Sequence, residues 1–264
     1  MVKILAVANQ KGGVGKTTTS VNLAASLAAA DRRVLLVDLD PQGNATTGSG
    51  INKSELTKTV YHVLLEQHGL ADVRLTAPQG NYDVIPANRE LAGAEVELVD
   101  EERREQRLKR ALAEVVDQYD YVLIDCPPAL SLLTINGLVA ASSVMIPMQC
   151  EYYALEGLSD LVNTVKKVRA NLNPELEIEG LLRTMFDPRN ALAQQVSDQL
   201  QRHFGDKVYS TVIPRNIRLA EAPSYGTPVM YHDRASKGAL AYVALAGEFL
   251  LRREAATPAA RRDV

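Results

Sequence analysis

A glycine-rich loop at residues 9–18, with the sequence Asn-Gln-Lys-Gly-Gly-Val-Gly-Lys-Thr-Thr, constrains this chain more than any other feature. An apolar run at residues 4–8 precedes the loop, and a helical pattern at residues 20–27 follows it. A strand, a glycine loop and a helix in this order predict a phosphate-binding site, because loop N–H groups and the positive end of the helix dipole attract anions. We expect the following residues to bind the phosphates of a nucleotide: Gln10, Lys11, Gly12, Gly13, Val14, Gly15, Lys16, Thr17 and Thr18.

Two lysines stand in this loop, whereas the general pattern G-x-x-x-x-G-K-[ST] specifies one. Lys16 is the lysine of that pattern and can reach the β- and γ-phosphates, while the hydroxyl of Thr17 can hold Mg²⁺. Lys11 stands at the loop entrance, and Gln10 occupies the position of the first glycine. A glycine turn without a ligand is the simpler interpretation, but it leaves the register of glycines, lysine and threonines unexplained.

Apolar, β-branched runs alternate with helical patterns along the chain. Residues 34–37 and 121–124 are almost entirely apolar, as expected for strands buried on both faces of a parallel sheet. The alternation predicts an α/β fold with a doubly wound, mostly parallel sheet flanked by helices. We expect strands at residues 3–8, 33–38, 82–86, 121–126, 143–149, 178–186 and 208–213, and helices at 16–30, 55–67, 89–118, 131–140, 154–171, 190–203 and 235–252.

The length of 264 residues fits a single large domain, which we place at residues 1–253. Residues 254–264 are rich in Ala and Arg, contain Pro258, and predict a disordered tail. The run at residues 100–110 could be read as a basic patch, but its mixed signs favour a solvated helix face.

Charge is distributed unevenly, although the whole chain carries only −3. Residues 1–162 hold 14 basic and 21 acidic side chains, which gives −7, and residues 163–264 hold 15 and 11, which gives +4. An anionic partner should therefore meet the C-terminal part, unless the difference is a chance drift of surface charge.

The cysteines and the N-terminus indicate a cytoplasmic protein. Cys126 and Cys150 lie in apolar runs without CxxC spacing, which favours buried thiols in a reducing compartment. The chain starts directly with a predicted strand and shows no signal peptide. No apolar run approaches the roughly 20 residues of a membrane span.

Acidic residues end two of the predicted strands. Asp38 and Asp40 close the second strand, and their alternation points both to the same side of an extended backbone. Asp125 follows the apolar residues 121–124 of another predicted strand, which is the Walker-B arrangement of a carboxylate that supports Mg²⁺. Because ligands bind beyond the carboxyl ends of parallel strands, we expect all three carboxylates beside the glycine loop.

Five segments together carry a family resemblance: residues 11–18, 38–43, 124–128, 185–189 and 213–226. The first three resemble the motifs of the deviant-Walker ATPases of the ParA/MinD family. The last two, Met-Phe-Asp-Pro-Arg and Ile-Pro-Arg-Asn-Ile-Arg-Leu-Ala-Glu-Ala-Pro-Ser-Tyr-Gly, are similar to the chromosomal ParA (Soj) branch. The match runs from residue 1 to about residue 250.

The resemblance implies an ATP-dependent homodimer in which two subunits enclose two nucleotides. Lys11 would reach the partner's phosphates, and Lys16 would contact those of its own subunit. Thr17 would bind Mg²⁺, with Asp38 and Asp125 in its outer shell. Asp40 would position the hydrolytic water. This agrees with phosphoryl transfer, which needs positioning and positive charge at the γ-phosphate.

The resemblance also implies partners. Nucleotide-base contacts would come from Met185, Pro214 and Asn216. The family's ATP dimer binds double-stranded DNA without sequence preference, and a ParB-type centromere-binding protein stimulates its slow hydrolysis. The chain would therefore be associated with the nucleoid. Arg189 and Arg218 match the family's DNA-contacting arginines, and Arg215 and Lys237 are neighbouring candidates, although all four could be ordinary solvated cations.

Three other functions are less compatible with the sequence. A MinD-like membrane-cycling ATPase requires an amphipathic C-terminal helix, and residues 250–258 offer little apolar face. An iron–sulfur reductase requires paired cysteines at a dimer axis, whereas Cys126 follows the predicted magnesium-supporting carboxylate and Cys150 ends a strand. A scaffold without enzymatic activity would not need the complete set of phosphate and magnesium residues.

Overall fold

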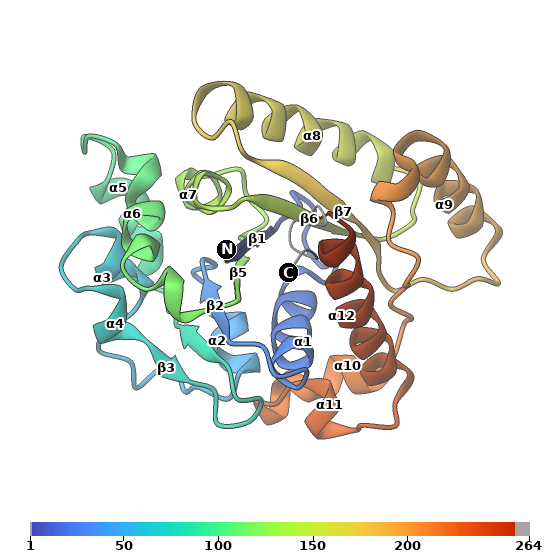
Figure 1. The fold of residues 1–264 in the computed structure, drawn as a ribbon, viewed down its shortest axis with the longest axis horizontal. Helices are drawn as coiled ribbons and strands as arrows, with labels where there is room; N and C mark the ends of the chain where they lie inside the picture. Colours follow the sequence, from blue (N-terminus) through green and yellow to red (C-terminus); the bar gives the residue numbers. More distant parts are fainter. Residues whose placement is uncertain (1, 257–264) are drawn as a thin grey trace, which may run out of the picture.

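A parallel sheet forms the centre of the computed structural model, which describes residues 2–256 (Figure 1). Within these residues, the strand order is β3-β4-β2-β5-β1-β6-β7, and only β3 runs antiparallel to its neighbour. The predicted doubly wound α/β fold is thereby confirmed. The strands are β1 (Lys3–Val7), β2 (Val34–Asp38), β3 (Leu75–Thr76), β4 (Asp83–Ile85), β5 (Tyr121–Asp125), β6 (Ser143–Met148) and β7 (Glu177–Arg183).

Strand register brings the predicted acidic residues to one edge. Every residue of β2 and β5 is buried, which explains their uninterrupted apolar sequences. Asp38 is the register partner of Asp125, and Val7, the residue that ends β1, pairs with Asp125 from the other side. The carboxyl ends of three central strands therefore meet beside the loop that follows β1.

Helices cover both faces of the sheet and enclose two apolar cores (Figure 1). On one face, α7 and α8 pack with α3, α5, α6 and α9; on the other, α1 packs against α12 and α2. The helices are α1 (Lys16–Ala28), α2 (Asn44–Gly48), α3 (Val60–Leu64), α4 (Leu70–Val73), α5 (Leu91–Glu97), α6 (Arg107–Ala113), α7 (Leu132–Ala140), α8 (Ala154–Asn171), α9 (Ala191–Phe204), α10 (Ile217–Glu221), α11 (Val229–His232) and α12 (Lys237–Ala256).

The strand predicted at residues 208–213 is wrong. Side chains take up the backbone groups that a strand would offer to a ladder: the Arg183 guanidinium donates to the carbonyls of Tyr209 and Ser210, at 2.8 and 3.2 Å. The Glu248 carboxylate accepts the N–H groups of Ser210 and Thr211, each at 2.8 Å. An isolated bridge between Leu181 and Val208 and a hydrogen bond from the Ile213 N–H to the Arg183 carbonyl, at 2.9 Å, connect this segment to β7, but they form no continuous ladder.

The helix predicted at residues 89–118 is divided into α5, α6 and two short 3-10 turns. Arg103 has φ +54°, a left-handed backbone conformation that interrupts a right-handed helix. The antiparallel strand β3 and the short helices α2, α4, α10 and α11 were not predicted, because their apolar patterns are too short to be periodic. Helix α12 continues through Ala256, so the start of the predicted tail 254–264 is helical. Residues 257–264 lie outside the described residues.

Candidate nucleotide and magnesium site

The glycine loop between β1 and α1 has the backbone of an anion site. Gly13 and Gly15 have φ +71° and +86°, which residues with a side chain rarely adopt. Gly15 is the N-cap of α1, and no side chain caps the first helical N–H groups. These N–H groups and the helix dipole therefore remain available to a phosphate.

Lys16 and Lys11 occupy different environments. Lys16 is only 6% exposed, and its ammonium donates to the carbonyl oxygen of Lys11 at 3.1 Å. Burial lowers the pKa of Lys16, and the neighbouring Asp125 carboxylate opposes that shift. The Lys11 ammonium is instead exposed and forms an ion pair with the Glu151 carboxylate. One lysine thus lies inside its own site, and the other lies on the molecular surface.

Asp125 connects strand β5 to the start of α1. Its two carboxylate oxygens accept hydrogen bonds from the hydroxyls of Thr17 and Ser20, each at 2.8 Å. Thr17 is thereby held at the mouth of the loop. Ser20 was not predicted as a site residue, although its place three residues after Thr17 puts both on one helix face.

Asp38, the last residue of β2, is held in place by Thr46 on α2. Its carboxylate accepts the N–H and the hydroxyl of Thr46, at 2.8 and 2.7 Å, and the N–H of Asp40 at 3.1 Å. The Thr46 hydroxyl also accepts the N–H of Ala87 at 2.9 Å. Asp40 itself is 8% exposed and accepts the N–H of Gln42 at 2.9 Å. Thr46 was missed because nothing in the sequence connects residue 46 with residue 87.

The oxygen groups at this edge fit a magnesium ion. Burial raises the pKa of Asp38, and burial together with the charge of Asp38 raises the pKa of Asp125. A divalent cation would stabilise the ionised form of both carboxylates. A threonine hydroxyl beside carboxylates is the hard oxygen donor set that Mg²⁺ prefers. Thr17 would hold the ion, with Asp38 and Asp125 behind it.

A cavity of about 280 Å³ adjoins the loop and brings together residues far apart in the sequence. The predicted base contacts Met185, Pro214 and Asn216 line it together with Gly15 and Thr18. A backbone bridge between Phe186 and Pro214 joins the two late segments. The Thr184 hydroxyl donates to the Val14 carbonyl at 2.7 Å and ties them to the loop. Arg215, predicted to contact DNA, also lines this cavity.

Known proteins share this architecture and sequence. A family model described as an AAA domain matches residues 2–178. Soj of Bacillus subtilis, named a sporulation initiation inhibitor protein, is 58% identical over 248 residues, which is 94% of this chain and 98% of that protein. The chromosome partitioning protein ParA of Myxococcus xanthus is 50% identical over 259 residues, 98% of this chain and 92% of that protein.

The chain belongs to the ParA/MinD family, in its Soj branch. A Mycobacterium smegmatis structure described as cobyrinic acid a,c-diamide synthase with a bound ATP analogue and magnesium has a TM-score of 0.84 at 39% identity, covering 97% of both chains. The septum site-determining protein MinD of Pyrococcus horikoshii, complexed with Mg-ADP, has a TM-score of 0.78 at 25% identity, covering 97% of this chain and 98% of that one. As a member of this family, the chain is a P-loop ATPase.

The predicted DNA contacts of this ParA-family chain lie on segments that touch one another. The bridge from Phe186 to Pro214 places the loop of Arg189 beside that of Arg215, and Asn216 lies close to Gly238, next to Lys237. Arg189 pairs with Asp187 at 2.8 Å, and Arg218 pairs with Glu221 and Asp233 at 2.8 and 3.3 Å. These acids offset part of the positive charge in a single subunit.

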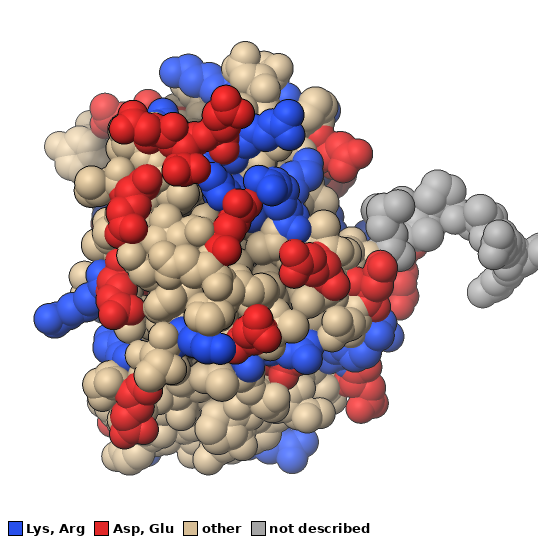
Figure 2. All heavy atoms as spheres, turned by 90° about the vertical axis from the view of Figure 1, so that its left-hand side faces the viewer, with Lys and Arg blue, Asp and Glu red and all other residues tan. Residues whose placement is uncertain are grey.

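The opposite side of the ParA-type fold carries mixed charge. The view onto the side that carries α3 to α6 shows acidic and basic side chains interspersed (Figure 2). The run at residues 100–110 contributes to this surface, but Arg107 is 7% exposed and pairs with Glu66 and Glu101 at 2.5 and 2.7 Å. The prediction of a solvated helix face is therefore wrong for Arg107, whose ion pairs join α6 to its surroundings.

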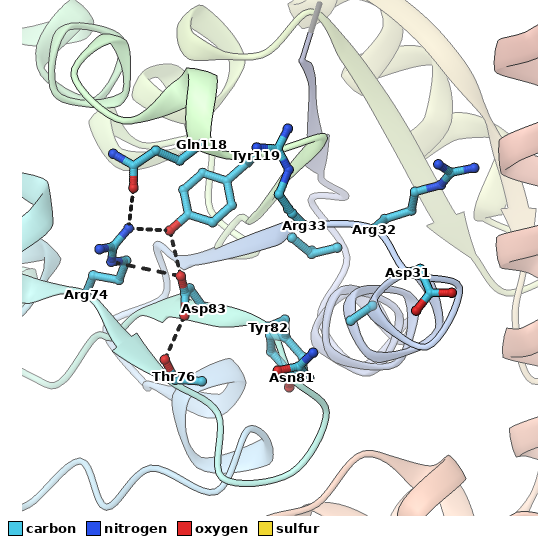
Figure 3. A pocket seen from close by; sticks show the side chains of 12 residues that line it. Asp31, Arg32, Arg33, Arg74, Thr76, Asn81, Tyr82, Asp83, Gln118 and Tyr119 are labelled. Carbon is cyan, nitrogen blue, oxygen red and sulfur yellow. Dashed lines mark hydrogen bonds and ion pairs between the residues drawn. The ribbon is translucent and has the colours of Figure 1, made fainter.

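A larger cavity, of about 530 Å³, lies at the amino ends of β2 and β4, away from the loop (Figure 3). Five of its lining side chains bind one another: the Arg74 guanidinium donates to Gln118 and Tyr119, and the hydroxyls of Tyr119 and Thr76 donate to Asp83. Size alone therefore does not identify the candidate site.

The cysteines and the helices bear on the iron–sulfur and membrane alternatives. Cys126 and Cys150 are both buried, and burial raises the pKa of each thiol. Neither thiol is presented at a surface where two subunits could share a cluster. Between residues 2 and 256, none of the helices combines the length and apolar character needed to cross a membrane.

Proposed function

We propose that this chain is a DNA-partitioning ATPase of the ParA type. ATP and Mg²⁺ close two subunits into a sandwich homodimer, the dimer binds double-stranded DNA without sequence preference, and hydrolysis releases it. A ParB-type partner bound at a centromere-like site stimulates hydrolysis. The relatives named Soj and ParA, and the similar solved structure with a bound ATP analogue and magnesium, support this proposal.

The contrast between Lys16 and Lys11 carries the proposal. Lys16 is buried beside its own loop and is positioned for phosphates bound in its own subunit. Lys11 is about half exposed at the loop entrance, and its ammonium pairs with the Glu151 carboxylate. A surface lysine next to a phosphate site can complete the site of a facing subunit, which couples charge at the γ-phosphate to dimerisation.

Dimerisation also supports the DNA contacts. Each subunit offers Arg189 and Arg218, and acidic neighbours partly neutralise both. Two copies side by side double the number of phosphate contacts, and affinity for DNA rises steeply with that number. ATP would thereby control DNA binding through dimer formation.

Slow intrinsic turnover is part of the proposal. No arginine occurs in the motifs at residues 9–18, 38–43 or 124–128, and the absence of an arginine finger can cost 10³–10⁵ in rate. A slow ATPase serves as a timer for the lifetime of the DNA-bound dimer. We place the protein in the cytoplasm, associated with the nucleoid.

DNA binding measured with ATP, with ADP and without nucleotide tests the proposal. We expect binding only with ATP, with an affinity that falls steeply as salt increases and is equal for unrelated DNA sequences. Anionic lipid vesicles in the same three conditions form the control. Equal DNA binding in all nucleotide states would contradict the proposal, and ATP-dependent binding to vesicles instead of DNA would favour the MinD-like alternative.

A further inference from the structure

The outward face of α12 is apolar and exposed. The inward face of this helix packs Tyr242, Leu245 and Phe249 into the core beside α1. On the outward face, Leu240 and Leu251 remain 58% and 67% exposed. This face takes no part in the nucleotide site or in the arginine contacts proposed above, and of the candidate DNA contacts it carries Lys237, at its first residue.

The exposed positions of α12 follow the spacing of a coiled-coil seam. They are separated alternately by three and four residues, the a/d pattern along which two helices pack with a shallow left-handed crossing. The seam consists of Lys237, Leu240, Ala244, Gly247, Leu251 and Glu254, all of them exposed. Val243 flanks it and is exposed as well.

The seam is complementary to itself when two copies run antiparallel. With the two-fold axis between residues 245 and 246, Leu240 faces Leu251, which gives two apolar pairs. Lys237 faces Glu254 at both ends, which gives two pairs of opposite charge. A parallel arrangement would instead set lysine against lysine and glutamate against glutamate. A two-fold interface requires this self-complementarity.

Gly247 independently indicates that a second helix packs against this face. Glycine weakens the interior of a helix relative to alanine, so a glycine in the middle of α12 calls for a compensating contact. A Cβ placed on Gly247 would meet no atom of the described chain within 4 Å. In the antiparallel pair Gly247 faces Ala244, and two small residues at the centre let the backbones approach closely.

The charged residues beside the seam are already engaged within the chain. The Glu248 carboxylate accepts the N–H groups of Ser210 and Thr211, each at 2.8 Å, and pairs with Arg252 at 2.7 Å. Bringing two copies together therefore leaves neither Glu248 nor Arg252 without its partner.

We propose that the outward face of α12 is a self-association surface, occupied by the antiparallel α12 of a second copy of this chain. Pairing needs no nucleotide, because none of the seam residues belongs to the loop. Each chain then has two self-association surfaces, one closed by ATP and one on α12, so α12 can connect one sandwich dimer to another. This inference stands or falls separately from the proposed function.

Sedimentation equilibrium without nucleotide tests the surface. We expect reversible dimers, and we expect Leu240→Glu to raise their dissociation constant at least about tenfold, because two apolar pairs are lost in each dimer. The matched control is Val96→Glu on α5, an apolar residue that is 75% exposed, more than Leu240. ATP-dependent dimerisation of Leu240→Glu should stay intact and shows that the variant is folded. A strictly monomeric nucleotide-free protein, or equal effects of both variants, would overturn the proposal.

Charge exchange and cross-linking test the orientation. Lys237→Glu and Glu254→Lys should each weaken dimers in DNA-free buffer, and the double variant should restore them. Leu240→Cys mixed with Leu251→Cys should form a mixed disulfide faster than either variant alone, with little background because Cys126 and Cys150 are buried. Failure of the double variant to restore association would refute the antiparallel pair, as would equal cross-linking in all mixtures. Leu240-dependent binding to lipid vesicles by a monomer would assign the face to a membrane surface instead.

Discussion

The Lys11 ammonium is ion-paired with the carboxylate of Glu151, 140 residues further along the chain. Both side chains are about half exposed, at the mouth of the phosphate loop. In the proposed dimer Lys11 must leave Glu151 to reach the partner's nucleotide. In the single subunit, the ion pair with Glu151 therefore restrains the Lys11 side chain.

Glu151→Gln should favour the ATP dimer. An exposed pair of this kind is worth about 0.2–1 kcal/mol, and two pairs open per dimer, so the dissociation constant should fall about 2- to 30-fold. Light scattering over a protein dilution series in ATP measures the change, with Glu156→Gln on α8 as the control. An unchanged or weaker dimer would show that Glu151 does not restrain Lys11.

Asp40→Ala should bind ATP and dimerise but stop hydrolysis. Asp40 lies after β2 beside Asp38 and is almost completely buried. If it positions the water, its removal should lower turnover at least about 10²-fold. Phosphate release measured with DNA present checks this, and Glu102→Ala on the α5–α6 connection is the control. Turnover near that of the unaltered protein would assign the water to another residue.

Arg218→Glu should abolish DNA binding while ATP dimers persist. The change removes one phosphate contact in each subunit and places a negative charge beside Glu221 and Asp233. If binding can still be measured at low salt, the slope of log affinity against log salt concentration should be shallower by about 2. Each lost phosphate contact contributes roughly 0.9, and the dimer loses two.

Arg110→Glu is the matched charge reversal, because Arg110 is similarly exposed and pairs with Glu66 on the opposite side of the molecule. Gel shifts with ATP compare the two variants. Equal losses would mean that net charge, and not the position of Arg218, governs binding.

Thr46→Val should destabilise the fold by about 1–3 kcal/mol. The substitution keeps the shape of the buried side chain but leaves the Ala87 N–H and one bond to the Asp38 carboxylate without a partner. Urea unfolding measures the loss. Thr47→Val removes a hydroxyl that donates only to the Gly43 carbonyl one turn earlier, so it should cost less than about 1 kcal/mol. Equal costs for both variants would argue against a special role for Thr46.

The predictions that succeeded rest on short segments. The α/β fold and the family were predicted correctly, because buried parallel strands have continuous apolar sequences and the loop motif is contained within ten residues. The predicted loop residues lie in the expected backbone, and Asp38 and Asp125 are neighbours because parallel strands align their carboxyl ends. Their roles in binding and catalysis stay predictions.

The failures follow from contacts between distant segments. Residues 208–213 have the composition of a strand, yet the side chains of Arg183 and Glu248 bind four of the backbone groups that a continuous ladder would use. Whether backbone groups pair with a ladder or with side chains depends on which side chains the fold brings near.

The sequence by itself determined the chemistry of the phosphate loop, the acidic strand ends and the parallel sheet. Each depends on residue types at a fixed spacing, and the local backbone geometry of a loop or strand then places their side chains. Only the tertiary structure decided that Glu151 pairs with Lys11, that Thr46 joins Asp38 to the backbone at Ala87, and that the seam of α12 faces outward. These relationships join segments up to 140 residues apart, or depend on which helix face the core covers, and the packing of the whole chain sets both.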